Sequence, residues 1–125
     1  IINSGLPDGF TVDAELRDEG AEILCDRALI ERAVFNLISN AVRHNTPPCA
    51  VHLTEYSEGG YVRVVVRDNG QGAPQEVLDS IAFIPDAAHG LGLPMAYRIA
   101  AAHGGQLDAH NDQGLVVTMT LPLAE

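Results

Sequence analysis

Basic residues are scarce in this sequence, which contains seven lysines and arginines against seventeen aspartates and glutamates and has a formal net charge of −10. A surface this acidic repels the phosphate backbone of nucleic acids and anionic lipids, so neither is an expected partner. Cysteine is also rare: Cys25 and Cys49 form no CxxC pair and no secretory signal is present, which favours reduced core thiols in a cytoplasmic protein. No apolar run approaches the roughly 20 residues that cross a bilayer, so direct contact with a membrane is not expected either.

Tracts rich in proline, serine or glutamine are missing too, while apolar residues make up 46% of the 125 positions. Such a composition is typical of a globular protein, and this length suits one domain with its own core. We therefore expect residues 1–125 to form a single domain. The sequence begins at Ile1 without an initiator methionine, which suggests a fragment of a longer chain.

Helices are predicted from apolar residues that recur with the period of a helix. The clearest pattern runs from Leu29/Ile30 to Ala41/Val42, where apolar pairs return every four positions and form one wide stripe. Prolines and paired glycines mark the ends of such segments. Three helices are predicted. The first runs from Asp26, its N-cap, to before Pro47, the second covers Pro74–Ile81, and the third runs from Met95 to Gly104-Gly105.

Strands are predicted where apolar and polar residues alternate between turn signals. They cover Phe10–Leu16, Val51–Tyr56, Tyr61–Arg67, Gln106–His110 and Leu115–Leu121. Turns and hairpins, not regular βαβ crossovers, join the later strands. The pattern therefore favours an α+β fold, a two-layer sandwich in which a mixed, mostly antiparallel sheet packs on about three helices. A doubly wound parallel sheet is the alternative.

Polar residues border the apolar stripe of the long helix, where the sequence reads NLISNAVRH. At about 100° per residue, Asn36, Asn40, Arg43 and His44 fall within one arc of its surface. An amide oxygen is a suitable ligand for Mg²⁺, and Arg43 can donate hydrogen bonds to phosphate oxygens. A solvated polar edge of an amphipathic helix explains the same pattern equally well.

A second motif, Asp68-Asn69-Gly70-Gln71-Gly72, follows the valine-rich strand. Asn-Gly is typical of a hairpin turn, but the residues that follow are helix-like and do not form a partner strand. A carboxylate at the end of a strand, next to glycines that allow a flat ligand to approach, could accept a hydrogen bond from an adenine amino group.

A third motif, His89-Gly90-Leu91-Gly92-Leu93-Pro94, precedes the last helix. Glycines at a helix N-terminus leave backbone N–H groups free to bind phosphate, with the positive end of the helix dipole behind them. A flexible loop before a helix that starts with proline is the alternative, since a lone Gly-x-Gly is weak evidence.

In this order and spacing, the three motifs resemble those of the GHKL superfamily of ATP-binding domains, and within it the catalytic (HATPase) domain of sensor histidine kinases. Residues 36–44 resemble the N box, 68–72 the G1 box and 90–93 the G2 box. The resemblance extends over about residues 10–122.

This resemblance implies a GHKL, or Bergerat-type, sandwich that binds Mg-ATP between its helices and a lid. Asn40 would be the magnesium ligand, and Asn36 the catalytic residue that faces the phosphates. The remaining expected contacts are Arg43, His44, Gly90, Leu91, Gly92 and Leu93 to the phosphates, Asp68 to the adenine amino group, and Gly70 and Gly72 to the base.

Members of the superfamily that hydrolyse ATP carry a glutamate where this sequence has Asn36, and an amide is not a useful general base. The resemblance therefore implies transfer of the γ-phosphate to a histidine on a separate dimerisation domain of the same parent chain, with a response regulator downstream. None of the five histidines begins the His-Glu or His-Asp signature of an acceptor. We expect an isolated monomer that binds ATP but does not autophosphorylate alone.

The sequence also departs from the family pattern. The segment between Ile81 and Gly90 is short for a lid, and Phe83 is its only aromatic residue. Other departures are at Asn45, Ala73, Ala88 and Val116. They leave open a different class of function, a degenerate nucleotide-binding or docking module (a pseudokinase) that regulates a partner without phosphoryl transfer.

Overall fold

A computed structural model describes residues 9–16, 27–43, 45, 48–79 and 93–123, and these form an α+β sandwich. Its sheet has the strand order β1-β2-β3-β5-β4. The strands are β1 (Phe10–Leu16), β2 (Cys49–Glu58), β3 (Tyr61–Asp68), β4 (Gln106–Asn111) and β5 (Leu115–Pro122). Only β1 and β2 pair in parallel; the other neighbours in this sheet are antiparallel. The predicted mixed, mostly antiparallel sheet is confirmed, and the alternative of a doubly wound parallel sheet is wrong.

Two tight turns connect the antiparallel strands. Gly59 and Gly60 join β2 to β3 with φ angles of 59° and 86°, a left-handed conformation that glycine adopts without strain. The turn between β4 and β5 contains Gln113 and Gly114, also at positive φ. Both hairpins were predicted from the glycines and the alternating residues around them, although the strands extend one or two residues beyond the predicted ends.

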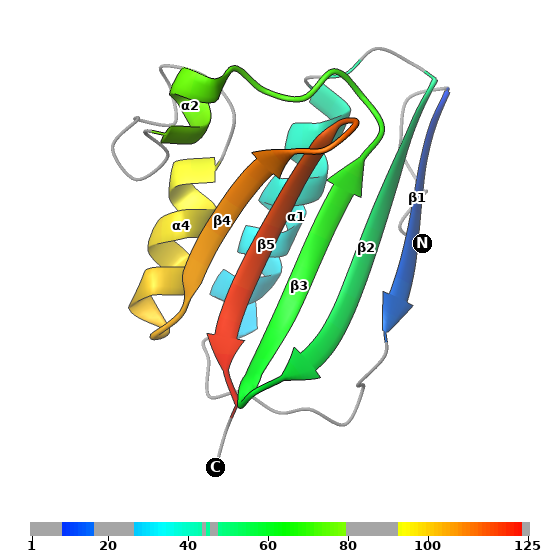
Figure 1. The fold of residues 1–125 in the computed structure, drawn as a ribbon. Coiled ribbons are helices and arrows are strands. Elements are labelled where there is room, and N and C mark those ends of the chain that lie inside the picture. Colours follow the sequence, from blue (N-terminus) through cyan, green and yellow to red (C-terminus); the bar gives the residue numbers. More distant parts are fainter. Residues whose placement is uncertain (1–8, 17–26, 44, 46–47, 80–92, 124–125) are drawn as a thin grey trace.

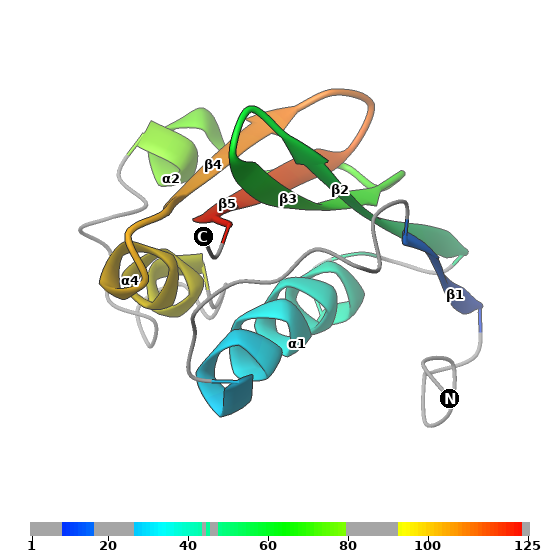
Figure 2. The same ribbon diagram turned by 90° about the horizontal axis from the view of Figure 1, so that it is seen from below.

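Three described helices accompany the sheet: α1 (Arg27–Arg43), α2 (Gln75–Asp79) and α4 (Leu93–Ala102). Helices α1 and α4 pack against each other and cover one face of the sheet, as Figure 2 shows from below. The predicted N-cap Asp26 and the end of the second helix at Ile81 lie outside the described residues. None of the described helices is long and apolar enough to cross a membrane.

The hydrophobic core lies between these helices and the sheet. Alanines on the buried faces of α1 and α4, such as Ala33, Ala96 and Ala100, are fully buried and let the helices approach closely. Larger side chains fill the layer from both sides, with Leu37 on α1 and Met119 on β5 among the most deeply buried. The predicted apolar stripe of the long helix therefore faces the core, except at Leu29 in the first turn, which is exposed.

Several elements end at the same edge of the sandwich. The C-terminal end of α1, the end of β3 at Asp68, the β4–β5 turn and α2 gather at the top of Figure 1. Since the predicted N box and G1 box lie at two of these ends, the fold brings segments together that are about thirty residues apart in sequence.

Candidate functional site

Asn40 is a buried polar residue in the last turn of α1, with 2% of its surface exposed. Its Oδ1 has no hydrogen-bond partner among the residues that the structure describes. A buried acceptor without a donor costs about 1–3 kcal/mol, so such an atom in a native fold usually binds a water molecule or another ligand. A hard cation is such a ligand, and Asn40 therefore fits the predicted role of an amide that binds Mg²⁺. Asn36, one helical turn earlier, is half-buried.

Asp68 ends β3 and is 5% exposed. Its Oδ1 accepts hydrogen bonds from the backbone N–H groups of Gly70, at 2.9 Å, and Leu115, at 3.2 Å. Gly114 passes so close that a Cβ there would lie 2.0 Å from the Asp68 carbonyl oxygen. The carboxylate is thus held in one orientation by the turn that follows it and by the start of β5, as a group that recognises a ligand by hydrogen bonding requires.

The glycines of the G1-like loop lie against asparagine side chains. A Cβ on Gly70 would lie 1.8 Å from Oδ1 of Asn45, and a Cβ on Gly72 would lie 2.4 Å from Oδ1 of Asn111. Gly72 also has a φ angle of 79°, which disfavours any other residue. A side chain at either glycine would therefore displace the facing asparagine, and at Gly72 it would also strain the backbone.

Sequence reasoning missed these two asparagines as parts of the site. The sequence indicates Asn45 only as a departure from the family pattern and does not single out Asn111. They lie 26 and 38 residues from the loop positions that they contact. No periodicity or motif connects positions so far apart, so only the folded structure could show these contacts.

Cys49, at the start of β2, is a buried free thiol. Burial raises the pKa of this thiol, and the negative charge of Asp68 raises it further, while a backbone hydrogen bond from Asn69 opposes both effects. The group therefore stays protonated at neutral pH and behaves as a core residue. This confirms the predicted reduced thiol at Cys49, and Cys25 lies outside the described residues.

The remaining predicted contacts are only partly covered by the structure. Arg43 is the last residue of α1 and Leu93 the first of α4. His44, Gly90, Leu91 and Gly92 lie outside the described residues. Asn40, Asp68, Gly70 and Gly72 therefore lie at one edge of the fold, Asn36 lies one helical turn further back along α1, and the G2-like segment stays a prediction.

No group of three or more histidine, cysteine, aspartate or glutamate side chains in the described part of the chain could hold a metal ion. At this edge, the Oδ1 atom of Asn40 could supply one oxygen ligand to a magnesium ion, with oxygens of a nucleotide and water as the others. Mg²⁺ usually binds proteins in this way, because it keeps several waters and takes phosphate oxygens.

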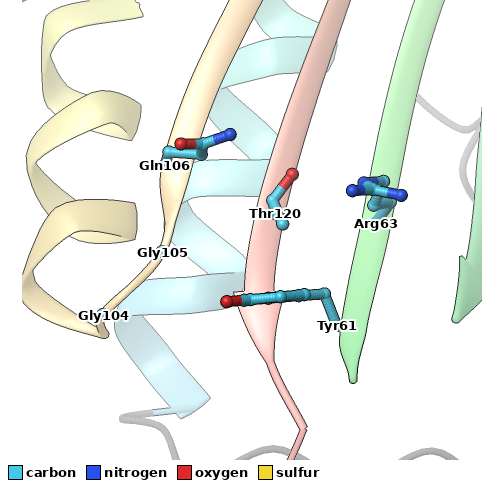
Figure 3. Close-up of a pocket in the computed structure, with 6 residues that line it drawn as sticks. All are labelled: Tyr61, Arg63, Gly104, Gly105, Gln106 and Thr120. Carbon is cyan, nitrogen blue, oxygen red and sulfur yellow. The ribbon is translucent and has the colours of Figure 1, made fainter. Parts of the chain in front are cut away.

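A polar pocket lies on the opposite face of the sheet, which neither α1 nor α4 covers (Figure 3). Tyr61 extends from β3 across β5 towards Gly104, and Arg63, which pairs with Glu58, lies further along β3. The lining residues are Tyr61, Arg63, Gly104, Gly105, Gln106 and Thr120. No predicted site residue lines this pocket, so it is separate from the candidate site.

The two-layer sandwich, with a buried amide on its long helix and a buried carboxylate at the end of a central strand, has the architecture of histidine kinase ATP-binding domains. Residues 25–125 match the family described as histidine kinase-, DNA gyrase B- and HSP90-like ATPase, and the chain belongs to this family.

The similar proteins include sensor kinases. The alginate biosynthesis sensor protein KinB of Pseudomonas aeruginosa is 34% identical over 122 residues, which cover 90% of this chain and 20% of KinB. Among solved structures, the catalytic domain of histidine kinase ThkA superposes with a TM-score of 0.79 at 26% identity, covering 91% of this chain and 79% of that one. The ATP-binding domain of PrrB from Mycobacterium tuberculosis gives the same TM-score and identity, with 95% and 84% covered. The chain thus spans about a fifth of the length of KinB.

Proposed function

We propose that this chain binds Mg-ATP at the edge formed by α1 and the end of β3, and donates the γ-phosphate to a histidine on a separate dimerisation domain. The observation that carries the proposal is the pair of buried polar groups at this edge. Asn40 presents an oxygen that no described residue hydrogen-bonds, and Asp68 presents an oriented carboxylate. Membership of the family and the similarity to the PrrB ATP-binding domain support it.

The proposed roles divide the residues among the base, the magnesium ion and the phosphates. The Asp68 carboxylate accepts a hydrogen bond from the adenine amino group, and the backbone at Gly70 and Gly72 lies along the base. Asn40 holds the magnesium ion, which neutralises charge on the phosphates. Asn36, Arg43 and His44 face the phosphates, together with Gly90, Leu91, Gly92 and Leu93.

Transfer to histidine, not hydrolysis, fits the residue at position 36. A hydrolytic site needs a base to activate water, and the Asn36 amide does not accept a proton near neutral pH. An imidazole nitrogen is itself a nucleophile. It forms the bond to the γ-phosphorus while the bond to the bridging oxygen breaks, ADP leaves, and the imidazole proton passes to solvent. The domain then needs only to position ATP and stabilise charge.

The proposed setting is cytoplasmic two-component signalling. The parent chain would supply the dimerisation domain with the acceptor histidine, and a response regulator would receive the phosphoryl group. In KinB, which is a sensor protein, the matched region is also a small part of a longer chain.

Titration with a non-hydrolysable ATP analogue, with and without Mg²⁺, tests nucleotide binding. The wild type should bind saturably and more tightly with Mg²⁺. Asn40→Asp should change the dependence on Mg²⁺, and Asp68→Ala should weaken binding roughly tenfold or more, as expected for a lost hydrogen bond to a charged group. The absence of saturable wild-type binding would contradict the proposal and favour a docking module.

Phosphoryl transfer needs a second experiment. The domain is mixed with the dimerisation domain of its parent chain and labelled ATP, and acid-labile phosphate is measured. Label should appear on the dimerisation domain and not on this chain alone. Intact nucleotide binding without any transfer would identify a pseudokinase.

A further inference from the structure

Two asparagine side chains clamp the loop Gly70–Ala73 by hydrogen bonds. The Nδ2 group of Asn45 donates a hydrogen bond to the Ala41 carbonyl, at 2.8 Å, and its Oδ1 accepts one from the Gln71 N–H, at 3.3 Å. Asn111 binds both backbone groups of Ala73: its Oδ1 accepts from the N–H at 2.9 Å, and its Nδ2 donates to the carbonyl at 2.8 Å. A carboxamide suits this task because it donates and accepts at once.

The loop is shaped to fit these two side chains. All three atoms nearest to a Cβ built on Gly70 belong to Asn45, and all three nearest to one on Gly72 belong to Asn111. The absence of side chains at the two glycines therefore makes room for the carboxamides. The hydrogen bonds then hold each carboxamide in the space that its glycine leaves open. Each clamp therefore consists of an asparagine and the glycine that faces it.

Asn45 also links the two halves of the candidate site. One of its bonds reaches Ala41, the residue after Asn40, and the other reaches Gln71, three residues after Asp68. The metal-binding half on α1 and the base-binding half after β3 are thus joined through a single side chain. Asn111, the last residue of β4, hydrogen-bonds Ala73 at the other end of the same loop.

Resting on the function proposed above, we propose that Asn45 and Asn111 are positioning residues for the nucleotide. They hold Gly70–Ala73 in the conformation that receives the base, and Asn45 sets the distance from that loop to the helix that binds the phosphates and metal. If the loop is already ordered before the ligand binds, binding carries no further entropy cost for ordering it. The clamps therefore increase the affinity for the nucleotide and the discrimination between bases.

The test compares Asn45→Ala and Asn111→Ala with the wild type. Dissociation constants are measured for non-hydrolysable ATP and GTP analogues, and amide hydrogen exchange of Gln71 and Ala73 is measured without nucleotide. Each variant should bind the ATP analogue roughly 3- to 10-fold more weakly, as expected for one or two net hydrogen bonds. The preference for adenine over guanine should narrow, and exchange at the clamped amide should accelerate.

Asp112→Ala is the matched control. Asp112 follows Asn111 in the same turn, but its carboxylate pairs with Arg67 at 3.3 Å on the other face of the sheet. This variant should keep the wild-type dissociation constants and the wild-type exchange rates at Gln71 and Ala73. A loss equal to that of Asn111→Ala would show that the whole turn matters and would overturn the proposal.

A double variant separates positioning from general destabilisation. In the nucleotide-free domain, Gly70→Ala should accelerate amide exchange at Gln71 because its Cβ displaces the Asn45 carboxamide, whereas Gly70→Ala combined with Asn45→Ala should exchange no faster than Asn45→Ala alone. Additive increases in the exchange rate would overturn the proposal, as would alanine variants that keep wild-type affinity and discrimination while the wild type binds normally. A wild type that binds neither analogue would instead refute the proposed function, and the positioning role with it.

Discussion

Asn40 is the residue at which stability and function are expected to conflict. Its buried Oδ1 has no partner in the described part of the chain. We predict that Asn40→Leu, which replaces the amide with an apolar side chain of similar size, raises the free energy of unfolding of the nucleotide-free domain by about 1 kcal/mol. The same change should abolish the effect of Mg²⁺ on nucleotide binding. Urea unfolding and nucleotide titration measure the two effects, and a marked destabilisation by leucine would show that the amide has a structural role.

Cys49 gives a prediction about pH. Because the pKa of the folded thiol is raised above its ordinary value of 9.0, the unfolded chain loses this proton at a lower pH than the folded one. The stability difference between the wild type and Cys49→Ala should therefore be constant below about pH 8 and shift against the wild type above about pH 9, by at most ~1.4 kcal/mol per pH unit. Other titrating groups cancel in this difference. A difference that stays constant to pH 11, in urea unfolding at each pH, would contradict the raised pKa.

At the scale of elements, the end of α4 depends on two glycines with different roles. Gly104 has a φ angle of 77°, and the N–H groups of Gly104 and Gly105 bind the carbonyls of Ala101 and Ala100, which closes the helix. A Cβ on Gly104 would meet only Pro122 at 3.7 Å, whereas one on Gly105 would lie 1.9 Å from the Thr120 carbonyl oxygen.

We therefore predict that Gly105→Ala is the more damaging change. Gly104→Ala should cost about 1 kcal/mol for the left-handed conformation, and Gly105→Ala about 3 kcal/mol or more because two backbones must separate. Thermal or urea unfolding of the two variants provides the comparison. Equal losses would mean that the segment between α4 and β4 can move away from β5 at little cost.

The elements themselves could be predicted because each follows from local periodicity. The apolar pairs of α1 and the valines of β3 indicate their structure without knowledge of the rest of the fold. The parallel pairing of β1 with β2 could not be predicted, since it joins positions such as Asp13 and His52 that are 39 residues apart. The same is true of the site: Asn40 and Asp68 stand out as motif residues, but the contacts that clamp the loop between them form only on folding.

For the whole molecule, the sheet predicts a gradient of local stability. Among the described strands, β3 and β5 have neighbours on both sides, while β1 pairs with β2 alone and has exposed side chains at Asp13, Ala14 and Glu15. Native-state hydrogen exchange should therefore be slowest in β3 and β5 and fastest in β1 among the strands, because an edge strand can open without disturbing the core. Equal protection in β1 and β3 would indicate that the sheet opens only as one unit.

The route of the chain between β1 and β2 also bears on the order of assembly. The β2–β3 and β4–β5 hairpins close over turns of a few residues, which takes microseconds in isolated chains. β1 can find its parallel partner only after the chain has passed through α1 and returned, so it has more loop-closure entropy to overcome than either hairpin. A chain emerging from the ribosome would make β1 first and dock it only once β2 has formed.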